Sequence, residues 1–531
     1  MAEETVISGE TKQVTRAAVL ISLGNISSRL LGLLREMVKS YFFGAGGVVS
    51  AFDVAAQVPT MFYDLLAGGM LSSALVPVFS DYAKSERQEE LWHLLSLLLS
   101  IVTVSLGGLL LLVEATAPQV ARLLGAGLEP EYLQLATRMI YITTPAILFL
   151  NVAALFSGVL YALQRFERPA FLGTVSNATL VLIVMLLGRS ALGAHSLAIG
   201  LLAGSLAQVL FQWHALRGVQ LHLVSPFTRH PALGTIAKLY LPIGLGLIVD
   251  QLTVALSFNL ASRTGASGIA WMKYAATIIQ FPLGMVVTAI SVAILPTLSR
   301  YATESAEESF RATLSKGLRL VLILIVPAAA MMLVLAEPLV GLLFQRGNFM
   351  PADTEAVSLV LRLNLLGLVF AALDQPLIFA FYARKDTWTP ALVGVAISGL
   401  YAALSLIPTL FAPPNLSLLI MANSLKLTGH ALLMLYLFAK KVGTLRPHGL
   451  AHTIRLAGAA AAVMLLPMVG GRYLVSLMGR AGIEKLLMEI ILSGGLGALT
   501  YLGLLRRLGV EEIQLLHAVL LRWWHRNKEV A

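Results

Sequence analysis

The sequence contains no cysteine, and only 12% of its 531 residues are charged. Without cysteine, the chain has no disulfide framework, no thiolate zinc site and no thiol nucleophile. The charged fraction is about half that of an ordinary soluble domain, whereas 57% of the residues are hydrophobic and the mean hydropathy is +0.82. A soluble chain of this length needs a more polar surface. The composition therefore predicts that a lipid bilayer surrounds most of the protein.

Sequence motifs of several large enzyme classes are also missing. The chain has no G-x-x-x-x-G-K-[ST] loop, no H-E-x-x-H pair and no G-x-S-x-G turn. Its ten histidines are scattered, so we predict no metal site, and we expect His430 to be a hydrogen-bonded packing residue. These absences favour a transporter over an enzyme. We predict no cofactor other than a coupling ion, sodium or proton, unless the membrane potential drives the process.

The net charge of +10 would suggest nucleic-acid binding in a soluble protein. Here the basic residues lie mainly in short loops between apolar segments, which is the topology signal of membrane proteins, so we predict no nucleic-acid partner. Residues 1–20 are polar and acidic, without a basic segment followed by a short apolar stretch and a cleavage site. We therefore expect no removable signal peptide.

Long apolar segments recur along the whole chain. A membrane-spanning helix requires about 20 mostly apolar residues, and the sequence predicts about fourteen such helices. The fold class is therefore an all-α integral membrane protein. The predicted spans are 17–43, 48–80, 90–113, 133–162, 171–188, 195–216, 234–261, 269–299, 313–344, 355–382, 389–411, 416–439, 452–477 and 484–506.

The basic residues of the connecting loops predict the orientation. Alternate loops carry clustered cations, whereas the loops between them carry isolated ones, and the positive-inside rule then places both termini in the cytoplasm of a multi-pass protein of the bacterial inner membrane. Two cytoplasmic termini require an even number of helices. The clustered cations are Lys84, Arg87, Arg165, Arg168, Arg217, Arg229, Arg300, Arg311, Arg384, Lys385, Lys440, Lys441, Arg446, Arg506 and Arg507.

Residues 55–85 and 277–304 resemble each other. Both contain Gln-x-Pro, a stretch of small residues and then Pro-x-x-Ser-x-Tyr-Ala. Each occurs in the second helix of a six-helix half, a design in which transporters hold substrate between repeated halves; chance similarity is the alternative. We thus predict two lobes around a central cavity, two further helices and an amphipathic tail on the cytoplasmic leaflet, or a frayed tail. The corresponding ranges are 1–218, 219–445, 446–509 and 510–531.

Charged residues inside the predicted helices need an explanation, because a charge near the bilayer centre costs about 3 kcal/mol or more unless it meets water or a partner. Cations from both halves could line one cavity for a substrate that carries phosphates, since arginine binds phosphate oxygens bidentately and lysine supplies a point charge. The alternative is a set of internal salt bridges, in which Arg29 or Arg35 pairs with Asp64, Asp53 or Glu36. The candidate substrate-binding residues are Arg29, Arg35, Asp53, Asp64, Lys273, Thr277 and Lys426.

Asp250, in the seventh predicted helix, is the candidate for coupling to a cation or a proton. A carboxylate inside a membrane helix can titrate or bind a cation. A helix-packing hydrogen bond is the alternative role for this side chain.

Five segments resemble the MviN/MurJ family, the lipid II flippases of the multidrug, oligosaccharidyl-lipid and polysaccharide (MOP) exporter superfamily. They occur in the family's order at 28–46 (SRLLGLLREMVKSYFFGAG), 57–82, 161–171, 271–284 and 343–354, the last followed by 381–390. The resemblance implies two six-helix lobes around a central cavity, with helices 13 and 14 forming a lipid-accessible groove. It also implies lipid II as substrate, alternating access driven by an ion gradient or the membrane potential, and membrane lipids and cell-wall synthesis proteins as partners.

The resemblance carries over only part of the family's charged residues. Arg29 and Arg35 match its cavity arginines on helix 1. The paired arginines of helix 2 are replaced by Tyr63 and Asp64, and the arginine of helix 8 corresponds to Thr277. The family's acid near the start of helix 2 aligns with Ser50, and the acid before the helix 8 arginine aligns with Ala276.

We hypothesise that residues on adjacent helical turns replace the missing family charges. Lys273 lies one turn before Thr277, Asp53 lies one turn after Ser50, and Lys426 adds a further positive charge. Asp250 would suit the sodium site of some family members, but helix 11 here has no carboxylate to complete that site. Alternative functions are a flippase for another polyprenyl-linked glycan, a small-molecule antiporter of the superfamily, and a membrane scaffold for cell-wall proteins.

Overall fold

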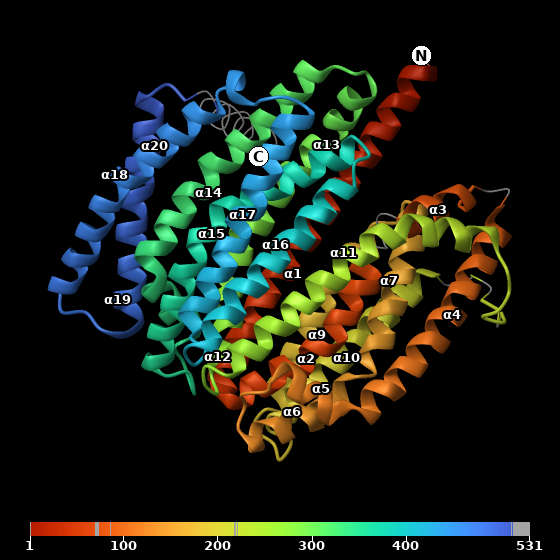
Figure 1. The fold of residues 1–531 in the computed structure, drawn as a ribbon, viewed down its shortest axis with the longest axis horizontal. Coiled ribbons are helices and arrows are strands. Elements are labelled where there is room, and N and C mark those ends of the chain that lie inside the picture. The colour runs from red at the N-terminus through yellow and green to blue at the C-terminus, as the bar shows by residue number, and fades with distance from the viewer. Residues whose placement is uncertain are drawn as a thin grey trace, which may run out of the picture. The chain divides into compact units, whose positions relative to one another are not determined.

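The computed structural model describes residues 2–68, 74–84, 87–216, 219, 221–222, 224–510 and 512, with side chains from residue 19 onward except at 242. These residues form helices and connecting loops, with no strand among them. The helices up to residue 262 are α1 (Ala2–Phe43), α2 (Gly47–Tyr63), α3 (Val76–Tyr82), α4 (Gln88–Ala115), α5 (Ala117–Leu124), α6 (Pro130–Thr143), α7 (Ala146–Ala162), α8 (Glu167–Ala170), α9 (Leu172–Leu187), α10 (His195–Trp213) and α11 (Pro231–Ser262) (Figure 1). The later ones are α12 (Gly268–Pro282), α13 (Thr288–Thr303), α14 (Glu307–Phe344), α15 (Pro351–Ala383), α16 (Trp388–Leu406), α17 (Leu416–Lys441), α18 (Leu450–Leu477), α19 (Gly482–Met488) and α20 (Gly494–Arg507).

Every predicted span contains helix among the residues that the structure describes. Within the described residues, ten helical segments are long and apolar enough to cross a membrane, and the bent pair α6–α7, with a break of 42°, gives an eleventh. The remaining predicted spans coincide with α1, α2–α3 and α9, the last of which is apolar but only 16 residues long. The structure therefore confirms an all-α membrane protein, while a number of crossings above eleven stays a prediction.

Prolines and π-helical turns interrupt helices that the sequence predicts as continuous. The span 48–80 is divided into α2, a π turn η1 (Asp64–Gly68) and α3, and the span 269–299 into α12, a π turn η5 (Leu283–Val287) and α13. Each π turn follows the proline of a Gln-x-Pro motif, Pro59 or Pro282. Proline has no N–H to donate, and a π turn is one way in which a helix absorbs the resulting break. The two similar segments thus share an interruption as well as a sequence pattern.

A proline inside a helix also leaves unbonded the carbonyl four residues before it. In α2 that proline is Pro59, and the carbonyl is that of Ala55. The Thr143 hydroxyl, at the end of α6, donates a hydrogen bond of 3.1 Å to this oxygen. Because an unpaired carbonyl inside a bilayer is costly, the break in α2 becomes a point of attachment for α6.

The long helix α14 uses its prolines in the same way. It contains two, one located four residues after Ile323 and the other four residues after Val334. The Tyr501 hydroxyl of α20 donates to the Ile323 carbonyl at 3.1 Å, and the Arg472 guanidinium of α18 donates to the Val334 carbonyl at 2.9 Å. Both carbonyls that the prolines leave unbonded therefore hold the C-terminal helices against α14.

Contacts divide the chain into two compact units, each with its own apolar core. The core of unit 1 includes Phe79, Leu91 and Phe156, and one core of unit 2 includes Phe310 and Phe438. The predicted lobe boundaries stay a prediction. Unit 1 comprises 1–274, 346–350 and 405–416, and unit 2 comprises 275–345, 351–404 and 417–531.

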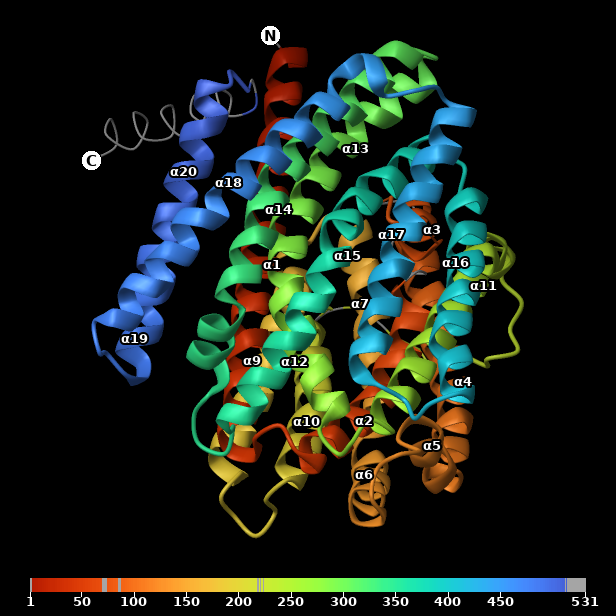
Figure 2. The same ribbon diagram turned by 60° about the vertical axis from the view of Figure 1, so that its left-hand side comes forward.

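Within unit 2, α18 packs along α14, and α20 returns along α18 after the short helix α19 (Figure 2). A π turn, η8 (Glu489–Ser493), joins α19 to α20. These segments correspond to the two helices predicted beyond the lobes. The predicted amphipathic tail lies outside the described residues apart from Val510 and Glu512, and so does Arg217 of the basic loops.

Candidate functional site

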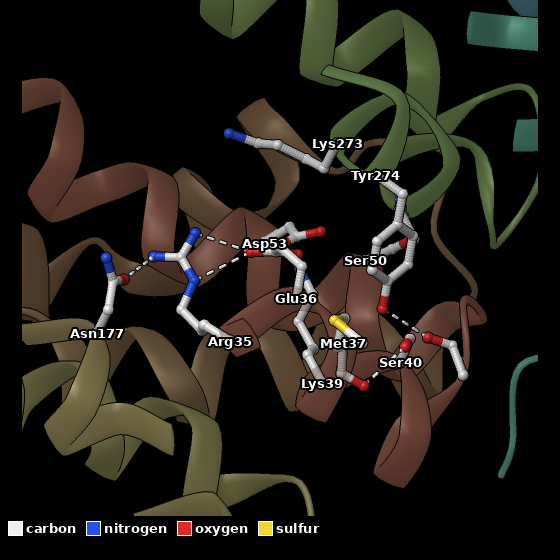
Figure 3. Close-up of polar contacts among 12 residues, drawn as sticks. Arg35, Glu36, Met37, Lys39, Ser40, Ser50, Asp53, Asn177, Lys273 and Tyr274 are labelled. Carbon is white, nitrogen blue, oxygen red and sulfur yellow. Dashed lines mark hydrogen bonds and ion pairs between the residues drawn. The ribbon is translucent and has the colours of Figure 1, made fainter. Parts of the chain in front are cut away.

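Five ionisable side chains from three helices of unit 1 form the candidate site (Figure 3). We call Arg35, Glu36, Lys39, Asp53 and Lys273 the charge cluster. The spacing of three or four residues on α1 places Lys39 beside both Arg35 and Glu36. The helices α2 and α12 supply Asp53 and Lys273.

The turn between α1 and α2 brings these helices together. Gly44 has a φ of +70°, a conformation that favours glycine, and a Cβ atom there would lie 2.5 Å from the backbone oxygen of Asn348. The hydroxyl of Tyr274, on α12, donates to the Gly44 carbonyl at 2.8 Å. The same turn therefore sets the approach of α1, α2 and α12.

Lys39 lies at the centre of the charge cluster and is only 2% exposed. Its Nζ is 2.6 Å from Glu36 Oε2 and 3.0 Å from Asp53 Oδ1. The Nζ also lies 4.9 Å from the centre of the Tyr274 ring, where the aromatic face attracts a cation. Two carboxylates and a ring thus compensate the burial of one ammonium group, which identifies Lys39 as a structural centre.

Arg35 is held at the edge of the cluster, with 38% of its side chain exposed. Its Nε and Nη2 donate to Glu36 Oε1 at 3.0 and 2.8 Å, and its Nη1 donates to Asn177 Oδ1 on α9 at 3.1 Å. Asn177 in turn donates to the Ser28 carbonyl at 3.1 Å. The guanidinium is therefore fixed in orientation while part of it remains accessible.

Lys273 approaches the cluster from α12 and is partly exposed. Its Nζ donates to Gln57 Oε1 at 3.0 Å and lies 4.9 Å from the centre of the Phe258 ring. Asp53 Oδ2 is buried and accepts no hydrogen bond from any described residue. With three cations and two carboxylates, the cluster has a net charge of +1 when every group is ionised, so it suits an anion.

The structure brings together only some of the predicted site residues. Arg35, Asp53 and Lys273 belong to the charge cluster. Arg29 is half-buried on α1, between one and two turns before Arg35. Asp64 is half-buried and begins the π turn η1.

Two further candidates lie in unit 2, and one lies elsewhere in unit 1. In unit 2, Thr277 is half-buried on α12, and Lys426 Nζ is 5.7 Å from the centre of the Tyr401 ring. Asp250, in unit 1, has an exposed side chain on α11. The assignment of all these residues to substrate or ion stays a prediction.

Sequence reasoning missed several members of the site. Of the salt bridges that the sequence left open as an alternative, the one between Arg35 and Glu36 is present, but the buried pair of Lys39 and Asp53 was not predicted. The signal was available, because Glu36 and Lys39 are an acid and a base three residues apart in a mainly apolar helix. Nothing in the sequence pointed to Asn177, whose role depends on the packing of α9 against α1.

A second polar pair lies in unit 2. His430 Nδ1 of α17 is 2.8 Å from Asp374 Oδ1 of α15, and both side chains are largely buried. This contact confirms the expectation that His430 is hydrogen-bonded. Among the residues that the structure describes, no group of three or more His, Asp or Glu side chains could hold a metal ion.

Comparison with known proteins identifies the family of this chain. The family model for "Lipid II flippase MurJ" matches residues 39–491. A "Probable lipid II flippase MurJ" of Haemophilus influenzae is 33% identical over 390 residues, which are 69% of this chain and 76% of the relative. The chain belongs to the MurJ family. A Bdellovibrio bacteriovorus relative with the same name is 27% identical over 96% of this chain and 98% of its own.

Solved structures agree with the MurJ fold. A structure of "Lipid II flippase MurJ, inward closed conformation" has a TM-score of 0.77 at 23% identity, covering 92% of this chain and 99% of that one. An inward-facing multidrug transporter of the MATE family, also of the MOP superfamily, has a TM-score of 0.65 at 13% identity and covers 81% of this chain. Membership in the MurJ family confirms the prediction of a transporter rather than an enzyme.

Proposed function

We propose that this chain moves lipid II, the undecaprenyl-pyrophosphate-linked peptidoglycan precursor, from the cytoplasmic to the outer leaflet of the bacterial inner membrane. Membership in the MurJ family supports this substrate. The observation that carries the chemical argument is the charge cluster, whose net positive charge lies among membrane helices. A pyrophosphate is an anion that such a group attracts, and each charge-assisted hydrogen bond to it contributes about 1.5–3 kcal/mol.

Arg35 and Lys273 would contact the pyrophosphate. Both are partly exposed, whereas Lys39 is enclosed by Glu36 and Asp53. A guanidinium has five N–H donors, so Arg35 retains donors beyond its contacts with Glu36 and Asn177. Lys39 would position the cluster without touching the substrate. Arg29, Asp64, Thr277 and Lys426 would contribute to the same polar path.

Transport would proceed by alternating access of two lobes, 1–218 and 219–445, around a central cavity, with both termini in the cytoplasm. The C55 tail would remain in lipid, along a groove formed by residues 446–509. Asp250 is the proposed coupling residue for sodium or a proton. Membrane lipids, and cell-wall synthesis proteins that supply or use the precursor, would be the partners.

Complementation of a strain depleted of its own lipid II flippase tests this function. Cells that produce the chain should survive, and an in-cell assay should detect lipid II at the outer surface. Arg35→Gln and Lys273→Ala should each reduce translocation about tenfold or more, the loss of one charged contact. Lys238→Ala removes an exposed lysine on α11, outside the charge cluster, and should have no effect.

Two results would contradict the proposal. Full activity of both cluster variants would exclude the charge cluster as a substrate site. The second result combines two observations. The unchanged chain fails to complement, and deletion of its gene in its own host removes a surface polysaccharide without accumulation of lipid II. This result would identify another polyprenyl-linked glycan as the substrate.

A further inference from the structure

A cavity of about 880 Å³ lies within unit 1, apart from the charge cluster. It is bounded by α1, α3, the start of α4 and the turn that follows α7. Ile21, Val76, Leu163 and Phe166 contribute its apolar wall. None of the five cluster residues lines it, and the proposed function makes no use of it.

Two cations, Lys84 and Arg165, lie on the cavity wall. Both side chains are exposed, and neither pairs with a carboxylate among the described residues. The nearby Arg87 differs, because it forms a 2.6 Å ion pair with Glu90 and lies over the Tyr82 ring. Lys84 and Arg165 therefore give the wall of the cavity a positive charge that no described carboxylate pairs with.

The backbone fixes Arg165 in place. Gln164, two residues after the end of α7, has a φ of +58°. The N–H of the next residue, Arg165, donates to the Leu160 carbonyl at 2.8 Å, and this hydrogen bond closes the helix terminus. The Arg165 Nη1 also donates to the Ala215 carbonyl at 3.1 Å. A cation held by both backbone and side chain is preorganised, so less freedom is lost when an anion binds.

The wall also offers uncharged hydrogen-bonding groups. Gln88 lines the cavity and lies four residues after Lys84. Phosphate oxygens accept hydrogen bonds from amides as well as from charged groups, and the apolar wall provides a surface for hydrocarbon. Cations, amides and apolar side chains in one cavity match an amphiphile with a phosphate head.

We propose that this cavity binds the phosphate headgroup of a membrane lipid, with Lys84 and Arg165 on the phosphate and the start of the lipid chain against Ile21 and Phe166. The lipid is either a resident anionic phospholipid or a polyprenyl pyrophosphate, since both present the same phosphate chemistry. The site is separate from the charge cluster and does not depend on what the cluster transports.

Native mass spectrometry of the purified full chain tests this site. Phosphatidylglycerol, undecaprenyl pyrophosphate and zwitterionic phosphatidylcholine are each titrated as the probe. Both chains compared carry Arg35→Gln/Lys273→Ala, which removes the proposed pyrophosphate contacts of the charge cluster. In this background, the double variant Lys84→Gln/Arg165→Gln should bind at least one of the two anionic lipids about tenfold more weakly than the chain with an unaltered cavity. The matched control, Arg229→Gln/Lys238→Gln, removes two exposed cations of unit 1 outside the cavity and should bind as the unchanged chain does.

A second variant fills the cavity and keeps its charges. Ser80 is exposed and lines the cavity. Ser80→Trp should therefore leave the fold intact and weaken the binding of the same anionic lipid. Loss of phosphatidylglycerol binding alone assigns the site to a resident phospholipid, and loss of undecaprenyl pyrophosphate binding alone assigns it to a polyprenyl carrier. Equal losses in the matched control, equal binding of phosphatidylcholine, or no effect of either cavity variant would overturn the proposal.

Discussion

At the scale of single residues, Lys39 shows how a charge is kept inside an apolar bundle. Its ammonium lies between the carboxylates of Glu36 and Asp53, and each of the three residues is at most 5% exposed. Removal of one partner from a buried ion pair leaves an uncompensated charge, which costs far more than the net contribution of the pair. The stability of the α1–α2 junction therefore depends on Lys39.

We expect Lys39→Met to lower the free energy of unfolding by about 3–5 kcal/mol, because Glu36 and Asp53 would then share a buried site without their cation. Thermal unfolding of the purified protein measures this loss. The double variant Lys39→Met/Asp53→Asn removes both charges and should recover part of it, as expected for coupled neighbours. A single variant as stable as the unchanged protein would contradict the role given to Lys39.

Asp386, in the loop between α15 and α16, predicts a dependence of stability on pH. Burial raises the pKa of its carboxyl, but hydrogen bonds from Lys441 and Thr389 outweigh burial and hold the pKa below its ordinary value. A carboxyl whose pKa is lower in the folded state stabilises the fold above its unfolded pKa, and this contribution disappears as pH falls through the folded pKa.

Asp386→Asn should therefore lower the melting temperature near pH 7, and the difference from the unchanged protein should shrink as the pH falls below the ordinary pKa of an aspartate and vanish once the folded carboxyl is protonated. Melting curves across this range check the expectation. Glu304→Gln provides a control in an exposed carboxylate at the end of α13. A difference that grows toward acid pH would have the wrong sign and would contradict the assignment.

At the scale of helices, prolines create attachment points rather than simple bends. Pro327 deprives the Ile323 carbonyl of its helical donor, and the Tyr501 hydroxyl replaces that donor from α20. The buried Tyr501 ring is 2% exposed and packs in the core that α14 shares with α18 and α20. The Tyr501 hydroxyl therefore pairs with the carbonyl that Pro327 leaves unbonded in α14 and also attaches α20 to that helix.

Tyr501→Phe keeps the ring and removes the hydroxyl, so it should cost about 1–3 kcal/mol, the penalty for leaving a buried carbonyl unsatisfied. Tyr436→Phe is the matched control, because Tyr436 is 62% exposed. Denaturation of both variants in the same detergent compares them. Equal stability of the two would argue against the replacement of the lost helical bond by Tyr501.

Hydrophobic length predicted where helices lie, because each predicted span contains helix in the part of the chain that the structure describes. It could not predict η1, η5 or η8, since a π turn depends on how the freed backbone is satisfied, and apolar composition does not encode that. The charge cluster was likewise predictable only in part. Arg35 and Lys273 are visible as charges in apolar segments, but Asn177 and Gln57 become partners only through tertiary packing.

At the scale of the whole molecule, polar contacts hold the C-terminal helices α18 and α20 within unit 2. Arg472 of α18 connects three segments. Its Nε is 3.0 Å from Glu489 in the π turn η8, its Nη1 donates to the Val334 carbonyl, and its Nη2 is 3.3 Å from Glu337 on α14. Glu489 is only 3% exposed, so its charge requires this partner.

We expect Arg472→Met to loosen α18 and α20 without unfolding unit 1, because it leaves Glu489 buried with only Lys485, at 3.8 Å, as a charged neighbour among the described residues. Hydrogen exchange should accelerate in α18 and α20 by about 100-fold or more, which corresponds to the roughly 3 kcal/mol lost when a buried pair is broken. Arg480→Met is the control, since its ion pair with Glu484 is exposed and contributes little.

If α18 and α20 form the lipid groove, translocation should fall in the Arg472 variant and recover with Arg472→Met/Glu489→Gln. Unchanged exchange in α18 would show instead that apolar packing alone holds the pair against α14.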